Sequence, residues 1–116
     1  MFKVIQGFYA VTGDIVNNDG TGNEANSGMV MRDENFELKH DDKYLISMVR
    51  PNGPHTTGSQ FMITFRAMPQ FDGLQQVIGR VSASTTAIID DLEALGSNDL
   101  MGMPSGAILI TDCVVA

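Results

Sequence analysis

The chain has 116 residues, 43% of them hydrophobic and 18% charged, which fits one compact globular domain and leaves no room for a second core. Fourteen acidic against seven scattered basic residues give a net charge of −7, which disfavours nucleic acid and an anionic membrane surface as partners. No apolar run approaches the ~20 residues of a membrane span, and a single cysteine, Cys113, excludes an internal disulfide and a thiolate zinc site.

Short β-type runs separated by turn residues recur along the chain. The predicted strands cover residues 2–5, 9–12, 45–48, 61–64, 77–81 and 107–115. In the last strand Cys113 occupies alternate positions with Leu109, Thr111 and Val115, which favours a buried structural thiol. One helix is predicted over 85–96, because Ile88, Ile89, Leu92 and Leu95 share a face, hydroxyl residues can cap its start and Gly96 can end it. The pattern predicts a mainly β fold, a barrel or sandwich with one helix packed at an end.

Two long connections interrupt these elements. Residues 14–35 are rich in Gly and Asn without a clear period, and loops of this length are uncommon unless they are functional or disordered. Residues 49–59 form a second connection, which Pro51 and Pro54 stiffen. The string GTGNEA at 20–25 has the form of a dinucleotide-binding pattern, but no predicted helix follows it, so no nucleotide cofactor is expected.

The two histidines do not indicate a metal or a hydrolase site. His40 and His55 lie far apart in sequence, and neither has a metal-ligand spacing with Cys113. His55 lies near Ser59, but the G-x-S-x-G motif is absent and no acidic residue is placed to orient the base. We expect neither a metal nor a cofactor.

Gln60, in GPHTTGSQFMITF (53–65), stands between a polar loop and an apolar strand. A glutamine at a strand entrance can cap the loop before it. Beside Phe61 and Met62 it can instead direct its amide into an apolar groove. The pattern of residues leaves both roles open.

Eight strings, in order along the chain, are similar to motifs of the cyclophilin family of peptidyl-prolyl cis-trans isomerases. They are FKVIQGF, TGD, NDGTGNEANSG, DENFELKH, ISM, GPHTTGSQFMIT, FDGLQQVIGRV and ITDC. The resemblance covers nearly the whole chain, and the ordered combination of DENF, GSQF and FDG is highly specific to the family. It implies a β-barrel with helices closing the ends, in agreement with the strand pattern.

The resemblance also implies an active site. The cation position of the family's F-H-R-I-I-P-G-F motif falls on Lys3, and the aromatic that follows falls on Phe8. The family's glutamine, which orients the substrate backbone, falls on Gln60. The family carries an arginine at the Lys3 position and a glutamine that holds this arginine at the Val11 position, so both the donor and its support are weaker here. A catalytic role for Lys3 and an exposed edge-strand lysine are both open.

The proline pocket implied by the resemblance is altered but keeps its apolar volume. Met62 replaces a phenylalanine and Phe71 a leucine, so together with Phe8 they are expected to hold the proline ring. Gln70 replaces a tryptophan associated with cyclosporin contact, which predicts weak or no cyclosporin binding. Tyr9 replaces a methionine.

The groove wall outside the ring pocket differs more. Gln75 replaces a histidine that lines the groove, and Arg50 replaces an asparagine. The segment 50–53 also carries one residue more than the family pattern. Val49, Arg50 and Gln75 are expected to contact substrate, but the substrate preference of the family cannot be transferred.

A complete cyclophilin opens with two strands and a helix before the segment that matches Met1. We therefore expect 1–116 to form a single partial domain, an incomplete barrel whose open strand edges invite a partner chain. The alternatives are a marginally folded chain or an upstream segment in the full gene product.

Three hypotheses follow. The first is a cytoplasmic prolyl isomerase, or a nuclear one, that acts with reduced activity on Xaa-Pro bonds of peptides and proteins. The second is a non-catalytic module that binds proline-containing segments. The third is a divergent copy that folds poorly.

Overall fold

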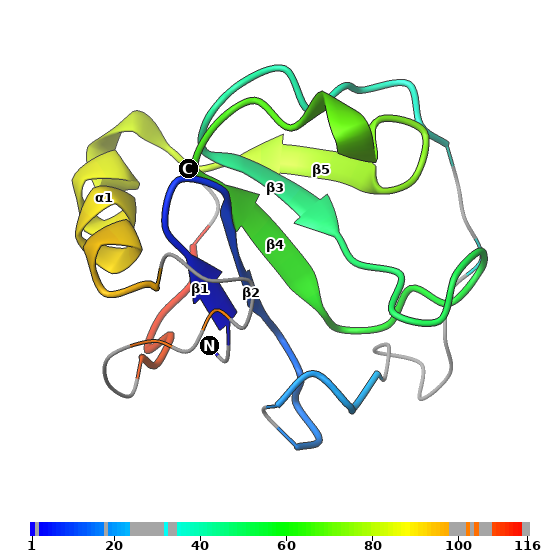
Figure 1. The fold of residues 1–116 in the computed structure, drawn as a ribbon, viewed down its shortest axis with the longest axis horizontal. Helices are drawn as coiled ribbons and strands as arrows, with labels where there is room; N and C mark the ends of the chain where they lie inside the picture. The colour runs from blue at the N-terminus through cyan, green and yellow to red at the C-terminus, as the bar shows by residue number, and fades with distance from the viewer. Residues whose placement is uncertain are drawn as a thin grey trace.

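The computed structural model describes residues 1, 3–17, 19–23, 32, 35–97, 102, 104 and 108–114. They contain one antiparallel sheet of five strands, ordered β1-β2-β4-β3-β5 (Figure 1). The strands are β1 (Lys3–Ile5), β2 (Tyr9–Thr12), β3 (Leu45–Met48), β4 (Phe61–Thr64) and β5 (Gln76–Arg80). Two short 3-10 helices, η1 (Pro69–Phe71) and η2 (Ala83–Thr85), precede β5 and the helix α1 (Thr86–Ala94), respectively. The predicted mainly β fold with a single helix is confirmed.

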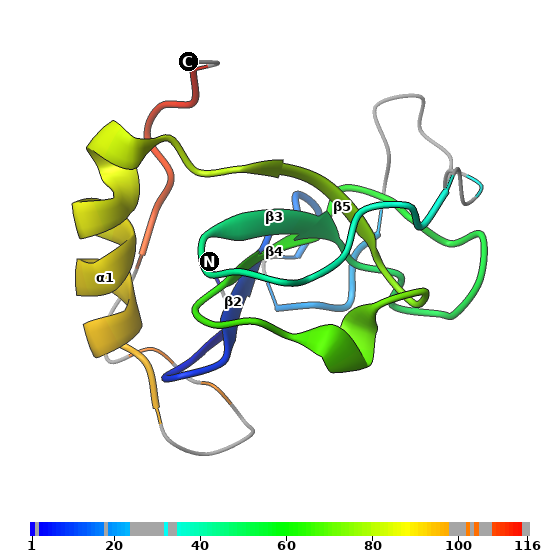
Figure 2. The same cartoon turned by 90° about the horizontal axis from the view of Figure 1, so that it is seen from above.

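One face of the sheet packs against α1. Alternate residues of β1, β2 and β4 point to this face, where Val4, Ala10 and Ile63 meet Ile89 and Leu92 of the helix. Figure 2 shows α1 lying beside one end of the sheet. Of the predicted helical face, Ile89 and Leu92 are buried, whereas Ile88 and Leu95 are 65% and 43% exposed. The prediction of one buried face is therefore right for Ile89 and Leu92 and wrong for Ile88 and Leu95, because the side of α1 that meets the sheet is centred between Ile89 and Leu92.

Polar contacts hold the helix at this position. The Tyr44 hydroxyl donates to Asp90 Oδ1 over 2.7 Å, and Lys43 Nζ lies 3.2 Å from the same oxygen. The backbone N–H of Gly7, in the β1–β2 turn, donates to Glu93 Oε2 over 2.8 Å. These contacts hold α1 against one face of the sheet, so the helix does not cover the opposite face.

The opposite face carries the residues that matter for the site. The register pairs Lys3 with Val11, Val11 with Met62, and Met62 with Ser47. Directly paired residues lie on the same face of a sheet, so these four side chains form one row across β1, β2, β4 and β3. Tyr9, two residues before Val11, also belongs to this face.

The edges of the sheet differ. The outer edge of β1 bonds to its own chain: Val4 N donates to Gly102 O, Gln6 N to Ser97 O, and Ser97 N to Val4 O, over 2.7 to 3.1 Å. The expected open edge is therefore partly covered at β1. At the other side of the sheet, β5 pairs with β3 and with no other strand of the described residues.

The predicted strand over 107–115 is wrong where the structure describes it. Residues 108–114 form no strand, and Cys113 is exposed rather than buried. Leu109 and Val114 are 76% and 83% exposed. A strand is stabilised by a neighbour that completes its ladder of hydrogen bonds, and no described strand runs beside this segment. Residues 2, 107 and 115, at the ends of predicted strands, lie outside the described residues.

Within the described ranges, no helix has both the length and the apolar character needed to cross a membrane. The start of α1 also differs in detail from the prediction. No side-chain hydrogen bond caps the helix, because the Thr85 hydroxyl bonds to the Ser82 carbonyl in the preceding 3-10 turn.

Candidate functional site

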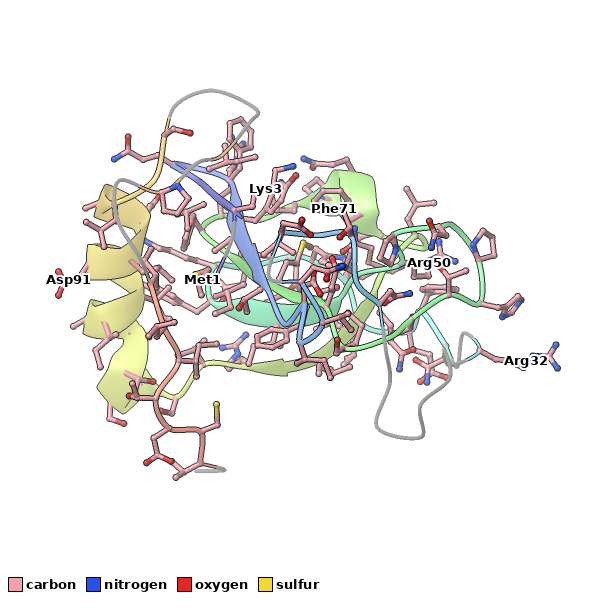
Figure 3. All side chains as sticks on the ribbon, turned by 90° about the horizontal axis from the view of Figure 1, so that it is seen from below. Met1, Lys3, Arg32, Arg50, Phe71 and Asp91 are labelled. Atoms are coloured by element: carbon pink, nitrogen blue, oxygen red, sulfur yellow. The ribbon has the colours of Figure 1, made fainter. Side chains whose placement is uncertain are left out.

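A cation and two aromatic rings lie together on the face of the sheet away from α1. Lys3 Nζ lies 5.8 Å from the centroid of the Tyr9 ring. The Tyr9 ring in turn meets Phe71 of η1 edge-on, with centroids 5.7 Å apart and an interplanar angle of 81°. Figure 3 shows Lys3 and Phe71 on the same side of the molecule, with Asp91 of α1 at the far end. We call Lys3, Tyr9, Met62 and Phe71 the aromatic patch.

Within the aromatic patch Met62 is buried, and the other three residues are accessible. Met62 is 1% exposed and lies two strands from Lys3 in the same register, with Val11 between them. Lys3, Tyr9 and Phe71 are each partly exposed. The structure thus places three of the predicted site residues, Lys3, Met62 and Phe71, in this patch and adds Tyr9. The sequence could have indicated Tyr9, because it lies two residues from Val11 in a predicted strand and so belongs to the same face.

Among the described residues, the Phe8 ring makes no aromatic or cation–π contact with the aromatic patch and instead lies beside Arg66. It occupies the β1–β2 turn, is 37% exposed, and has the Arg66 guanidinium 5.7 Å from its ring centroid. Its carbonyl accepts the N–H of Phe65 over 2.8 Å. These contacts connect Phe8 to the segment after β4, and its role in a ring pocket stays a prediction.

Gln60 is engaged with the long loop after β2. The side chain is 3% exposed, and its Nε2 donates to the carbonyl of Gly20 over 3.1 Å and to the carbonyl of Gly22. A glutamine amide nitrogen carries two hydrogens, so these two bonds use both. The contacts therefore show the loop-capping role, and an action of Gln60 on substrate stays a prediction.

Asp14 is the buried residue that organises the same loop, and the sequence analysis missed it. Its carboxylate is 4% exposed and accepts five backbone N–H groups over 2.9 to 3.1 Å. The donors are Val16, Asn17, Asp19, Gly20 and Gly22. Burial alone would raise the pKa of Asp14, but the backbone donors together bring this pKa well below its ordinary value. An aspartate directly before a Gly- and Asn-rich stretch was the signal available in the sequence.

Gly13 fixes where this loop leaves the sheet. Its φ is +90°, a conformation that favours glycine, and a Cβ built there would collide with the carbonyl oxygen of Ser59. The close approach of Gly13 to Ser59 sets the loop beside Gln60. Asp14 accepts the loop's N–H groups and Gln60 donates to its carbonyls, so the two residues act as complementary anchors.

The other residues expected to contact substrate are Val49 and Arg50, at the start of the connection 49–59, and Gln75, in the turn after η1. Val49 N donates to Gln60 O over 3.1 Å. The Arg50 guanidinium lies 5.2 Å from the centroid of the Phe36 ring. Gln75 N donates to Phe71 O over 3.0 Å, and Gln75 Oε1 is a buried acceptor without a hydrogen-bond donor among the described residues. A buried amide oxygen of this kind can accept an N–H from a ligand.

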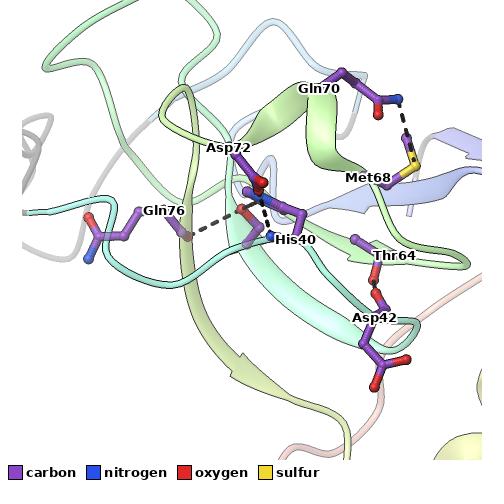
Figure 4. A network of polar contacts seen from close by, with 8 residues as sticks. His40, Asp42, Thr64, Met68, Gln70, Asp72 and Gln76 are labelled. Atoms are coloured by element: carbon purple, nitrogen blue, oxygen red, sulfur yellow. Dashed lines mark hydrogen bonds and ion pairs between the residues drawn. The ribbon is translucent and has the colours of Figure 1, made fainter.

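A Ser–His–Asp network is centred on His40, whose ring also meets Phe71 edge-on. Figure 4 shows His40 beside Asp72 in this network. His40 Nδ1 lies 3.0 Å from Asp72 Oδ1, and His40 Nε2 lies 2.8 Å from Ser47 Oγ. The order of groups is that of a hydrolase triad, but His40 and Ser47 are both 0% exposed, so the hydroxyl cannot reach a substrate. The backbone N–H and then the ring of His40 lower the pKa of Asp72, so the carboxylate is the stable form.

A cavity of about 470 Å³ lies at the other end of the sheet, along β3 and β5. Its lining residues are Leu38, Lys39, Asp41, Leu45, Val77, Gly79 and Arg80. None of these is a predicted site residue. No group of three or more His, Cys, Asp or Glu side chains in the described part of the chain could hold a metal ion.

The five-stranded antiparallel sheet and the one α-helix of the described residues define a mainly β protein. Residues 1–115 match the family described as "Cyclophilin type peptidyl-prolyl cis-trans isomerase/CLD", and the chain belongs to this family. It is 38% identical over 113 residues to the NK-tumor recognition proteins of Mus musculus and Homo sapiens. The match covers 97% of this chain and 8% of each relative, so the chain spans a small part of their length.

Proposed function

We propose that the aromatic patch binds proline-containing peptide segments and catalyses their cis-trans isomerisation with low efficiency. The observation that supports this proposal is the contact of Lys3 with Tyr9, and of Tyr9 with Phe71, on the sheet face that also carries the buried Met62. It places a mobile cation next to an apolar surface that can accept a proline ring. Membership of the isomerase family agrees with this use of the surface.

The chemistry asks little of the protein, because no bond is made or broken. Resonance gives the peptide C–N bond a rotation barrier of about 18–20 kcal/mol, and only Xaa-Pro bonds populate the cis form appreciably. Twisting the bond localises a lone pair on the prolyl nitrogen. A hydrogen-bond donor directed at that nitrogen therefore binds the twisted state more tightly than either planar state and lowers the barrier.

Lys3 is the residue that can supply this donor. Its ammonium lies above the Tyr9 ring, and the ring faces Phe71, so the cation and the apolar wall border the same surface. The ammonium is a point charge on a flexible stem, and Val11, its direct neighbour across the strand pair, offers no polar atom to hold it. The low efficiency follows from this loose placement.

A non-catalytic binding module is the second candidate. Two observations favour it: both hydrogens of the Gln60 amide nitrogen bond to loop carbonyls, and Val11 cannot orient Lys3. Proline binding through Tyr9, Met62 and Phe71 would then persist without rate acceleration. Both candidate functions predict poor cyclosporin binding. The reason is that Gln70, an exposed amide on η1, stands where the family has an aromatic residue for cyclosporin contact.

Exchange spectroscopy on a short Xaa-Pro peptide with substoichiometric protein separates the candidates. An isomerase increases the cis-trans exchange rate, and Phe71→Ala abolishes the increase. A binding module leaves the exchange rate unchanged but shows chemical-shift changes at Tyr9 and Phe71 on titration. Absence of both effects in a folded protein, with dispersed amide signals, contradicts the proposal, whereas collapsed signals support the poorly folding copy.

We also propose that the outer edge of β5, which pairs with no further strand among the described residues, is where a partner chain attaches. Ile78, in the middle of β5, is 54% exposed, and β5 has one strand neighbour among the described residues. An edge strand of this kind can extend its ladder onto a second chain. A second copy fits, because antiparallel pairing centred on Ile78 places Arg80 opposite Gln76 rather than opposite another cation.

A further inference from the structure

Phe71 stands on a turn that lies outside the sheet, between β4 and β5. It ends the three-residue η1, which has no side-chain cap. Local backbone bonds close the turn: Phe71 N donates to Met68 O over 3.0 Å, and Gln75 N donates to Phe71 O over 3.0 Å. Such bonds shape the turn but do not fix its position against the rest of the molecule.

His40 makes the contacts that fix this turn. Its carbonyl accepts Met68 N over 2.8 Å at one end, and its own N–H donates to Asp72 Oδ1 over 2.6 Å at the other. Its ring meets Asp72 Oδ1 at 3.0 Å and lies edge-on to Phe71, with centroids 6.0 Å apart and an interplanar angle of 66°. One residue therefore holds both sides of Phe71 and touches its ring.

His40 is in turn fixed to the sheet. Its Nε2 lies 2.8 Å from Ser47 Oγ, and Ser47, on β3, donates to the carbonyl of Gln76 on β5 over 3.2 Å. His40 and Ser47 are fully buried, and buried polar groups with satisfied hydrogen bonds hold a single geometry. The link runs from two sheet strands through the imidazole to the turn.

We propose that His40 is a positioning residue of the aromatic patch, which clamps the turn 68–75 so that the Phe71 ring meets Tyr9. The geometric part of this inference stands on the contacts of His40 alone. Its consequence for ligand affinity rests on the proposed function. A preorganised aromatic wall binds a proline ring without first having to be ordered, so loss of the clamp weakens binding.

The test compares His40→Leu, which removes the two side-chain polar contacts and the ring but keeps the backbone bonds to Met68 and Asp72, with His40→Asn, which retains a donor near the Nδ1 position. Ile89→Ala on the α1 face is the matched control, because it also empties a buried site but touches neither Tyr9 nor Phe71. Two readouts are measured: nuclear Overhauser effects between the Tyr9 and Phe71 rings, and the affinity of an Xaa-Pro peptide. Urea unfolding shows that each variant is folded under the assay conditions.

We expect His40→Leu to lose the Tyr9–Phe71 ring contacts and to weaken peptide binding by roughly tenfold or more, with His40→Asn in between. Ile89→Ala should keep both. In a Phe71→Ala background, His40→Leu should weaken binding no further, because its effect passes through the ring. If His40→Leu does not fold, Asp72→Asn removes the carboxylate that His40 holds and should show the same loss to a smaller extent.

Ring contacts that persist in folded His40→Leu, or in Asp72→Asn if that variant replaces it, overturn the inference. So does an additive effect of His40→Leu in the Phe71→Ala background. If the unsubstituted protein binds no peptide, the proposed function fails while the ring contacts still decide whether His40 positions Phe71. The two failures are therefore separable.

Discussion

Replacing Lys3 by arginine should increase the isomerase activity. Lys3 and Val11 are directly opposite each other on β1 and β2, so their Cβ atoms lie on the order of 5 Å apart on one face. A guanidinium at position 3 presents five donors in a fixed plane, and a glutamine at position 11 would lie within reach to hold it. The informative variants are therefore Lys3→Arg alone and Lys3→Arg together with Val11→Gln.

The size of the effect follows from the value of one well-placed donor. Such a donor contributes about 2.7–4 kcal/mol of transition-state stabilisation, equivalent to about 10²- to 10³-fold in rate. The loosely held ammonium of Lys3 supplies part of this, so Lys3→Arg should increase kcat/KM by about tenfold. The double variant should approach the full range. Val11 is 7% exposed, so Val11→Gln crowds the sheet face and should cost about 1–3 kcal/mol of stability.

The assay is the cis-trans exchange rate of an Xaa-Pro peptide at equal concentrations of folded protein. Lys43→Arg is the matched control, because Lys43 pairs with Asp90 on the α1 side and should leave the rate unchanged. Lys3→Ala should fall to the uncatalysed rate. Equal rates for Lys3→Ala, Lys3→Arg and the unsubstituted protein would refute a catalytic role for the cation and favour the binding module.

Three further predictions concern stability and association. The pKa values of Asp14 and Asp72 lie below their ordinary value near 3.8, so the stability that these carboxylates contribute is present above that pH and is lost as pH falls through the folded-state values. The urea concentration at the unfolding midpoint, measured from pH 7 to pH 2, should decrease at pH values below 4. The decrease should be smaller in Asp14→Asn, which already has a lower midpoint at pH 7. Parallel pH profiles for the two proteins would contradict the role of Asp14 as a loop anchor. Gly13→Ala forces a strained φ and a collision with Ser59, and should destabilise the fold by roughly 1–3 kcal/mol in urea unfolding, whereas an unchanged midpoint would show that the loop can shift. Ile78→Lys should shift the apparent mass in sedimentation towards the monomer at high concentration, and identical profiles for both proteins would exclude β5 as a self-association edge.

The buried network of His40, Ser47 and Asp72 shows why a catalytic pattern must be judged by access. Sequence analysis tested a nucleophile at Ser59 beside His55 and rejected it for lack of a motif. In the structure His40 instead contacts Ser47 and Asp72, in a site closed to solvent. Asp72 lies 32 residues after His40 in the sequence. Here the hydrogen bonds order a turn, and the imidazole acts on Phe71 rather than on a substrate.

Local patterns in the sequence determined which segments form the sheet and the helix. Strands 9–12, 45–48 and 61–64 were predicted with the bounds that the structure shows, and the predicted face of α1 contains both of its buried residues, Ile89 and Leu92, beside the exposed Ile88 and Leu95. These features depend on the period of apolar residues over four to ten positions, which a sequence carries directly. The order of the family motifs along the chain likewise identified the cyclophilin-type family, which residues 1–115 confirm.

Only the tertiary structure decided how these segments meet. It placed Tyr9 between Lys3 and Phe71, directed the Gln60 amide to the loop that Asp14 holds, and left 108–114 without a strand partner. Each of these depends on hydrogen bonds or ring contacts between residues far apart in the chain. Their energies are set by strand register and loop path, and no local period in the sequence encodes either.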